Sequence, residues 1–261
     1  SLMVSGTASA SYVSGPLPST PQNIASGLST QFEWVYQAAA PGTVWVSANA
    51  VGYNEANKAT ITAQAAWTNN VTIQPAASLT AGLVSISNQV SVGQIITVVM
   101  AVTNNGTAMA EGAYGVTPAA SIPANALVLT SPASVDIAGG ASTHFTWTYS
   151  ANASGSINFA SMIVGYDFNS KVTKTASANG GNVNIQTVPA LASAVSARPV
   201  LIKESVDAIT VILSVTNSGQ AAMTNVVPSL DITGSSTPMY LTGPAPAAAN
   251  ISGNGGNTRF T

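Results

Sequence analysis

Side chains able to do acid–base, nucleophilic or metal chemistry are scarce in this chain. Its 261 residues include one histidine, His144, six lysines and arginines, eight acids and no cysteine. A histidine that works as a catalytic base or metal ligand needs a carboxylate or hydroxyl partner in a fixed place, and no motif supplies one here. The lack of cysteine removes thiol nucleophiles, thiolate metal sites and disulfides. The sequence therefore predicts no catalytic residue and no enzyme.

One loop with oxygen ligands comes nearest to a metal motif. Residues 165–171 include Asp167 and Asn169, and the similar segment 52–58 has a single carboxylate, Glu55, moved by one place. A calcium site assembles about six or more oxygens, several of them carboxylates, whereas an Asn or Asp turn bonds only its own backbone. We therefore expect a structural turn, with neither a metal nor a cofactor.

A lysine–asparagine cross-link is a further option in a fibre without cysteine. The reaction needs a buried acid beside the pair and would lower the mass by one ammonia per bond. The lysines concerned are Lys171, Lys174 and Lys203, and the acids are Glu111, Asp136 and Glu204. No motif places any of these acids beside such a pair, so the option rests on composition alone.

The charge content excludes several classes of partner. Charged residues make up 5% of the chain and the formal net charge is −2. This excludes a basic footprint for nucleic acid and a polybasic membrane anchor. The longest strongly apolar stretch, Ile95–Val102, is too short to span a bilayer, and no signal peptide is visible at Ser1. A surface with so little charge repulsion favours association between copies of the chain.

Surface glycans are a second expected kind of partner. Candidate glycosylation sites in Asn-x-Ser/Thr sequons are Asn70, Asn105, Asn152 and Asn250. Composition alone produces several such sequons in a chain rich in Asn, Ser and Thr. Attached sugar would nevertheless suit an exterior that carries few charges.

An aromatic segment occurs twice in full and begins a third time, which divides the sequence into repeats. Phe32–Tyr36 recurs 113 residues later as Phe145–Tyr149 and begins again at Phe260. Self-similarity at one fixed period indicates an array of like modules. The joins predict the C-terminal part of one repeat at 1–75, a complete repeat at 76–188 and the N-terminal part of a further repeat at 189–261.

The two partial repeats leave two interpretations open. Each would expose unpaired strand edges if it stood alone. Either the chain is a window cut from a much longer array, or a neighbouring chain donates the missing strands. If a neighbouring chain donated strands, residues 229–261 would duplicate residues 1–33 and would have no obvious place in the sandwich. We therefore favour the interpretation that the chain is a window cut from a longer array.

Alternating apolar residues predict strands throughout. Every second position of Ile96–Val102 is apolar, and the pattern returns at Ile209–Val215. Phe145, Trp147 and Tyr149 share one face of a strand, which we expect to pack inward. Short strands separated by Gly, Pro, Asn and Ser predict an all-β fold of tandem Ig-like antiparallel β-sandwich modules, each of about 113 residues.

The opposite strand faces supply the candidate contact residues. His144 lies on the polar face of the aromatic strand, where the repeat places Gln31 and Arg259. Possible contacts between chains are Val99 and Ile212 on outer faces, and Trp45 and Trp67, which the repeat does not reproduce. An aromatic residue that does not recur is a better candidate for a surface contact than one that recurs as core residues do.

The complete repeat resembles the bacterial CARDB type, the cell adhesion related domain found in bacteria, and more loosely other Ig-like surface repeats. The segments that carry the resemblance are Leu79–Ser87, Val92-Gly93, Ile95–Val98, Val102–Gly106, Phe145–Tyr149 and Gly165–Asp167. Such families imply a seven-stranded sandwich (fibronectin III-like or CARDB-like), extracellular placement and a role in adhesion or surface architecture. They bring no catalytic residues that could be transferred to this sequence.

Together these features predict a non-enzymatic structural or adhesive protein at the cell surface, whose signal and anchor lie outside this segment. Its modules would pack through charge-poor faces in a filament, sheath or stalk, with copies of the same chain as partners. The alternative is the spacer region of an adhesin that binds a receptor or carbohydrate at a distal tip.

Overall fold

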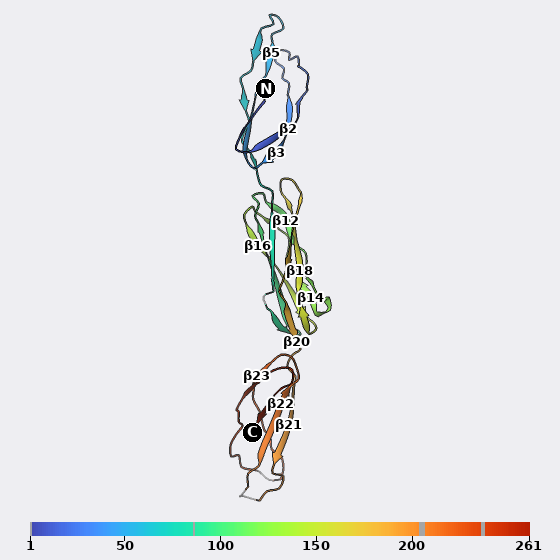
Figure 1. The fold of residues 1–261 in the computed structure, drawn as a ribbon, viewed down its shortest axis with the longest axis vertical. Coiled ribbons are helices and arrows are strands. Elements are labelled where there is room, and N and C mark those ends of the chain that lie inside the picture. The colour runs from blue at the N-terminus through green and yellow to red at the C-terminus, as the bar shows by residue number, and fades with distance from the viewer. Residues whose placement is uncertain (1, 86, 204–206, 236–237) are drawn as a thin grey trace.

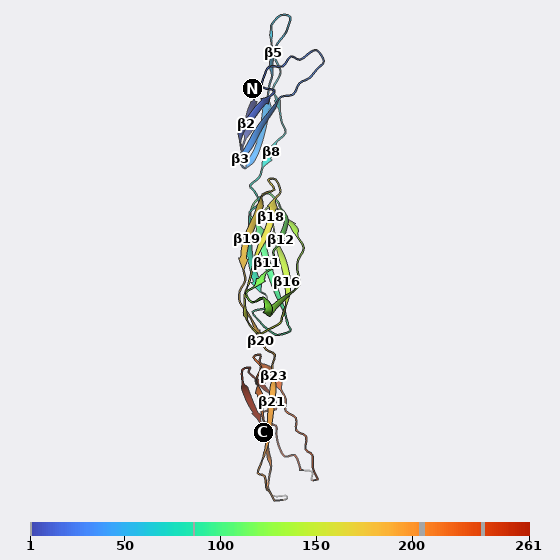
Figure 2. The ribbon, with the colours of Figure 1, turned by 90° about the vertical axis from the view of Figure 1, so that its right-hand side faces the viewer.

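The computed structural model describes residues 2–85, 87–203, 207–235 and 238–261. Strands hold 53% of the chain and helical residues 1%, and the helical turn is the 3-10 element η1 (Pro123–Asn125). The strands form three groups that share no sheet, β1–β8, β9–β20 and β21–β25. Figures 1 and 2 show these groups following one another along the long axis. The prediction of an all-β fold with antiparallel sheets is confirmed.

The middle group contains two main sheets and one small one. The first main sheet has the order β14 (Ala126–Thr130), β16 (Ser142–Ala151), β11 (Ile95–Asn104) and β9 (Leu79–Ser85). The second has the order β13 (Ala119–Ala120), β18 (Phe159–Asp167), β12 (Ala110–Gly115) and β15 (Val135–Ile137), with β19 (Thr173–Asn179) also on β18. In the small sheet, β20 (Val183–Gln186) pairs with β10 (Gln89–Ser91) in parallel and with β17 (Gly155–Ile157) in antiparallel.

The core of the middle group lies between its two main sheets. The predicted inward residues of β11 alternate with half-buried or exposed ones, and Ile96, Val98, Met100 and Val102 are all 0% exposed. The aromatic strand β16 buries Phe145, Trp147 and Tyr149 against them, since these residues pair with Met100, Val98 and Ile96. The inward faces predicted for both strands are therefore confirmed, and the second sheet covers them with residues such as Phe159 and Ile163.

The outer groups are smaller. In the first, β1 (Leu2–Gly6), β7 (Ala66–Trp67) and β8 (Val71–Ile73) pair with β4 (Gly42–Ala48), β2 (Ser9–Leu17) with β3 (Glu33–Ala40), and β5 (Val51–Tyr53) with β6 (Thr60–Thr62). In the third, β21 (Leu191–Arg198), β22 (Thr210–Asn217) and β25 (Gly256–Phe260) form one sheet, and β23 (Met223–Val226) pairs with β24 (Ala249–Ile251).

Equivalent strand pairs recur with the same register at the spacing of the sequence repeat. Leu79 pairs with Asn104, and Leu191 pairs with Asn217. The pair Gly42–Ile73 in the first group corresponds to the pair Gly155–Ile185 in the middle group. In the same way, the pair Tyr53–Thr60 corresponds to the pair Tyr166–Thr173. Each match is a shift of 112 or 113 residues. The sheets separate between β8 and β9 and between β20 and β21, whereas the domain limits 75/76 and 188/189 stay predictions.

Equivalent apolar residues are buried to different degrees in the middle and third groups. Ile209 is 46% exposed where Ile96 is 0%, and Leu191 is 43% exposed where Leu79 is 8%. An inward face is shielded from water only when a second sheet covers it. In the third group the buried apolar cluster consists of Val215, Ile251 and Phe260. The same sequence pattern therefore yields a closed core in the middle group and an open one in the third.

One local expectation needs correction. Gly165, Tyr166 and Asp167 were expected in a loop, but they are the last three residues of β18, and the turn follows at residues 168–170. The strand continues because Gly165 and Tyr166 pair with Lys174 and Thr173 across the hairpin. Asp167 therefore closes the turn from its position at the end of strand β18.

The difference in burial predicts unequal effects of one substitution at two equivalent positions. Ile96→Ala should destabilise the middle group by about 3 kcal/mol, because it opens a cavity in a closed core. Ile209→Ala should cost less than about 1 kcal/mol, because that side chain already meets solvent. Chemical denaturation of the two variants and the wild type measures both values, and equal losses at the two positions would contradict the description of the cores.

Candidate functional site

The linker between the first and middle groups is held by one buried asparagine. Asn104, at the end of β11, is 0% exposed. Its Oδ1 accepts hydrogen bonds from the backbone N–H of Ser78 (3.0 Å) and Gly106 (3.1 Å). Its Nδ2 donates to the carbonyls of Ala108 (2.8 Å) and Ile137 (3.1 Å). All the hydrogen-bonding capacity of one side chain thus joins the linker to the segment after β11 and to β15, and we call this arrangement the linker clamp.

The same clamp recurs at the second linker. Oδ1 of the buried Asn217 accepts from the N–H of Ala190 (3.0 Å) and Gly219 (3.1 Å). Its Nδ2 donates to the carbonyls of Ala221 (2.8 Å) and Ile251 (3.4 Å). The recurring Val-Thr-Asn-Asn-Gly and Val-Thr-Asn-Ser-Gly segments are therefore the sequence signature of the clamp.

Glycine is required in each clamp by a close approach of the linker. A Cβ atom added to Gly106 would lie 2.0 Å from the carbonyl oxygen of Ala76. One added to Gly219 would lie 2.0 Å from the carbonyl oxygen of Val188. Both distances are far inside van der Waals contact with backbone atoms, so any larger residue would push the linker away from the segment that carries the glycine, after β11 or β22.

Further hydrogen bonds tie both linkers to the group that follows them. Ala108 N–H donates to the carbonyl of Pro75, and Ala221 N–H donates to that of Thr187, each at 3.0 Å. At the second linker, Gln220 Oε1 also accepts from Thr187 N–H (2.9 Å). The described linkers therefore belong structurally to the groups that follow them.

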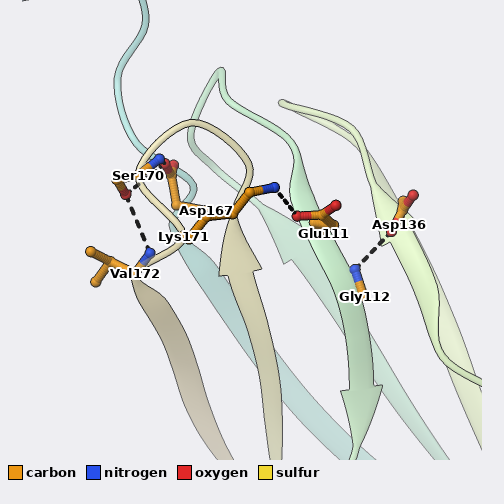
Figure 3. Close-up of polar contacts among 7 residues, drawn as sticks. All are labelled: Glu111, Gly112, Asp136, Asp167, Ser170, Lys171 and Val172. Atoms are coloured by element: carbon orange, nitrogen blue, oxygen red, sulfur yellow. Dashed lines mark hydrogen bonds and ion pairs between the residues drawn. The ribbon is translucent and has the colours of Figure 1, made fainter.

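A polar cluster at the end of β18 reinforces the first linker (Figure 3). Asp167 is 2% exposed, and its Oδ2 accepts from the backbone N–H of Ala77 at 2.7 Å. Its Oδ1 accepts from the N–H and the hydroxyl of Ser170, both at 2.8 Å. One carboxylate thus closes the turn after β18 and also holds the linker.

These contacts decide the protonation of Asp167. Burial acts to raise the pKa of the carboxyl, because it disfavours the charged form. The hydrogen bonds from Ala77 and Ser170 and the nearby charge of Lys174 act in the other direction and prevail, so the pKa lies below its ordinary value of 3.8. Asp167 is consequently ionised in the folded chain near neutral pH.

The turn after β18 has a counterpart in the first group. Asn54 Oδ1 accepts from the N–H of Ala56 (2.9 Å) and Asn57 (3.2 Å), and Lys58 and Lys171 both have a φ of 55°. Both turns therefore close on their own backbone, as the sequence analysis expected. Among the described residues, no group of three or more His, Cys, Asp or Glu could hold a metal ion.

The lysine and acids considered for a cross-link make other contacts. Lys171 Nζ forms an ion pair with Glu111, and Figure 3 shows both side chains at the rim of the sheet. Asp136 Oδ1 accepts from Gly112 N–H at 2.7 Å. The side chains of the ion pair are 61% and 40% exposed, so it contributes at most about 1 kcal/mol.

Other members of the proposed cross-link set also lie apart. Asn169 Nδ2 donates to Gln74 Oε1 (3.1 Å) rather than to a lysine or acid. Lys174 is half-buried near Asp167, and Lys203 N–H donates to Asp207. Glu204 lies outside the described residues. The contacts that involve the described candidates do not bring a lysine, an asparagine and a buried acid together.

The residues considered for acid–base chemistry lie on the surface. His144 is exposed on the outward face of β16, where its strand partner is Ala101. The positions that the repeat aligns with it, Gln31 and Arg259, are exposed as well. No helix in the described part of the chain is long and apolar enough to cross a membrane.

All four candidate glycosylation sites are exposed. Asn152 follows β16, Asn70 precedes β8, and Asn250 lies within β24, where its Oδ1 accepts from Asn225 N–H. Asn105 donates through Nδ2 to Thr80 Oγ1, beside the linker clamp. Their modification stays a prediction.

The four predicted contact residues differ in exposure. Trp67 is 57% exposed on β7, whereas Trp45 on β4 is half-buried. Val99 and Ile212 are half-buried on the outward faces of β11 and β22. They lie on different strands of different groups, so the fold does not gather them into one site, and their role stays a prediction.

Two tyrosines depart from the expected distinction between recurring and unique aromatic residues. Tyr53 and Tyr166 recur at the repeat spacing, yet they are 75% and 42% exposed. Recurrence therefore does not by itself identify a core residue. The signal that finds them is the alternation along β18, where the neighbouring Gly165 faces inward against Ala113 and Leu79.

Comparison with models of protein families finds none that matches the chain, and comparison with curated proteins finds no match either. The resemblance to the CARDB type therefore rests on the sequence motifs alone and stays a prediction.

Loss of the asparagine side chain should undo the linker clamp. Asn104→Ala would leave the buried N–H of Gly106 and two buried carbonyls without their partner, so we expect the middle group to lose about 3 kcal/mol. The matched control is Asn105→Ala, an exposed neighbour that should cost less than about 1 kcal/mol. Denaturant unfolding measures both variants, and a small loss at position 104 would contradict the role given to the clamp.

Acid should destabilise the middle group through Asp167. Because the folded pKa of this carboxyl lies below the ordinary 3.8, its charged form contributes stability above that pH. This contribution is lost as the pH falls through 3.8 toward the lower folded pKa. We expect the melting temperature to drop over this range and to depend less on pH in Asp167→Asn, which circular dichroism at different pH values measures. An equal pH dependence in both proteins would contradict the assignment.

Proposed function

We propose that this chain is part of a non-enzymatic extracellular repeat protein that builds a surface filament, sheath or stalk. In this proposal its three strand groups are tandem Ig-like β-sandwich modules of about 113 residues, of the CARDB-like or fibronectin III-like kind. The modules transmit load and contact neighbouring copies, and the side chains carry no catalytic role. Copies of the same chain are the main partners.

The observation that carries the proposal is the recurrence of the linker clamp. The same buried asparagine, invariantly followed two residues later by a close-packed glycine, ties both linkers to the sheets after them. A buried amide at each junction holds the linker to the group after it, because pulling the linker away would cost a hydrogen bond to a buried acceptor. A protein that acts as a stiff rod needs this property at every junction.

The outer sheet surfaces support lateral packing. Outward positions of β11 carry Thr97, Val99 and Ala101, and the adjoining positions of β16 carry Thr148, Thr146 and His144. Val99 also pairs with Val84, which is 60% exposed. Among the described residues, these outward positions carry no Asp, Glu, Lys or Arg, so a neighbouring copy meets little repulsion there.

The second candidate, the spacer of a receptor- or carbohydrate-binding adhesin, is favoured by one observation. Trp67 does not recur and is 57% exposed, as a contact to a different molecule would need. In that case the groups would act as a string, and lateral contacts between copies would be unnecessary. Surface glycans would be partners in either case, and nucleic acid in neither.

Electron microscopy of the native material tests the filament against the spacer. Identical faces packed in helical or lattice order support the filament, sheath or stalk. Isolated flexible strings whose neighbours touch nowhere would favour the spacer. At a resolution that traces contacts, the same images show whether strands cross between subunits.

Charge placed on the outer faces should oppose lateral packing. We expect Val99→Glu/Ile212→Glu to raise the concentration needed for assembly by about tenfold or more, because like charges would face each other between copies. The matched control, Thr20→Glu/Ser229→Glu, adds the same charge at exposed positions outside the strands. Sedimentation measures assembly, and equal behaviour of the two double variants would argue against these contact residues.

A further inference from the structure

We infer that the hairpin whose first strand carries each Val-Gly-Tyr segment presents a face that binds a second copy of this chain. The hairpin face consists of Val51, Tyr53, Thr60 and Thr62 in the first group and Val164, Tyr166, Thr173 and Thr175 in the middle group. This inference rests on the proposed structural role and adds a contact surface distinct from the face that carries Val99.

The residues of the hairpin face lie side by side because of strand register. Tyr166 pairs with Thr173 and Val164 with Thr175. Tyr53 pairs with Thr60 and Val51 with Thr62 in the same way. Gly165 faces the core, since a Cβ atom added there would lie 3.3 Å from Ala113 Cβ, so its neighbours Val164 and Tyr166 face outward.

The middle group extends the hairpin face across the sheet. Tyr114 pairs with Val164 on the other side of β18, and Tyr114, Met162 and Tyr166 are 42%, 37% and 42% exposed. Val164, surrounded by them, is 9% exposed although it points away from the core. An apolar strip thus crosses the outward side of the second sheet, flanked by the hydroxyls of β19.

The shape of the hairpin face favours a flat partner. The described hollows lie elsewhere: one is lined by Leu17, Gln31, Phe32 and Glu33, and the other includes Leu191, Val215 and Phe260 in the open core of the third group. Tyrosine is enriched where proteins contact each other, because it combines a large apolar ring with a hydrogen-bonding hydroxyl. A sheet face carrying tyrosines and threonines therefore suits another protein surface better than a small ligand.

Charge complementarity identifies that partner as a second copy. Lys171, just after the turn of the middle hairpin, pairs with Glu111 on the neighbouring strand β12, and the turn of the first hairpin carries Lys58 and Glu55. Each end is neutral but holds both signs, so two copies related by a twofold axis can place the lysine of one beside the acid of the other. A strongly charged partner would find no complementary field here.

The repeat spacing gives a second copy a further advantage. Two identical chains carry the two hairpin faces at the same interval. Contact at the face of one group therefore brings the face of the other group near its partner. The second contact then forms within an already associated pair, which strengthens binding without any new kind of interaction. A partner without this spacing would use one hairpin face at a time.

Removal of the two recurring tyrosines tests the inference. Tyr53→Thr/Tyr166→Thr should raise the concentration for lateral assembly by about tenfold or more, as sedimentation and electron microscopy of the full 261-residue chain would measure. The matched control is Tyr12→Thr/Tyr240→Thr, which removes two other tyrosines that are 57% and 70% exposed and donate to the carbonyls of Gly15 and Gly243.

The outcomes separate this inference from the proposed function. Loss of lateral assembly in Tyr53→Thr/Tyr166→Thr but not in the control supports the hairpin face. Assembly of both variants at the wild-type concentration would overturn the hairpin face and leave the proposed function standing. A wild-type chain that forms no lateral contacts at any concentration would overturn both.

Cysteine labelling supplies a measurement that does not depend on removing tyrosine. The chain has no cysteine of its own, so Thr175→Cys introduces one thiol on the hairpin face, and Thr20→Cys places one in an exposed loop. We expect assembly to slow maleimide labelling at position 175 by about tenfold while labelling at position 20 changes little. Equal labelling rates at position 175 before and after assembly would overturn the inference.

Discussion

A single buried amide is the interaction on which the arrangement of this chain depends. Asn104 satisfies two N–H groups with its oxygen and two carbonyls with its nitrogen, and its side chain is fully buried. Removing such a side chain would leave several polar groups buried without partners, which costs far more than each bond contributes on balance. The buried amide therefore holds the linker firmly, and Asn217 repeats the solution at the next junction.

This constraint connects the core to the ends of the groups. The strand that ends at Asn104 is also the one that buries Ile96, Val98 and Met100 against the aromatic strand β16. A linker held to the end of this strand is held to the most closed part of the fold. Asp167 adds a bond to the same linker from the opposite sheet, so both main sheets take part in the junction.

The low charge content has consequences inside and outside the fold. In the described residues, the polar side chains that organise the linkers are neutral amides, with one buried carboxylate, Asp167. The outward strand positions carry threonine, serine and scattered apolar residues, together with the recurring tyrosines of the hairpin face. Such a surface offers neighbours hydroxyls and apolar area with little repulsion, which agrees with the proposal of a self-associating surface protein.

The sequence by itself determined the all-β class, the repeat and the inward residues of the main strands, because alternation and spacing are local properties of the chain. It also indicated that Asp167 closes a turn. The alternation that places Ile96 and Val102 inward also places Asn104 on the inward face. The tertiary structure alone decided what its amide meets there, since Ser78, Ala108 and Ile137 come from other segments of the chain. Likewise, only the sheets decide that Ile96 is covered while the equivalent Ile209 is half exposed. Burial depends on which strand lies opposite, and that partner is set by contacts between residues far apart in the chain.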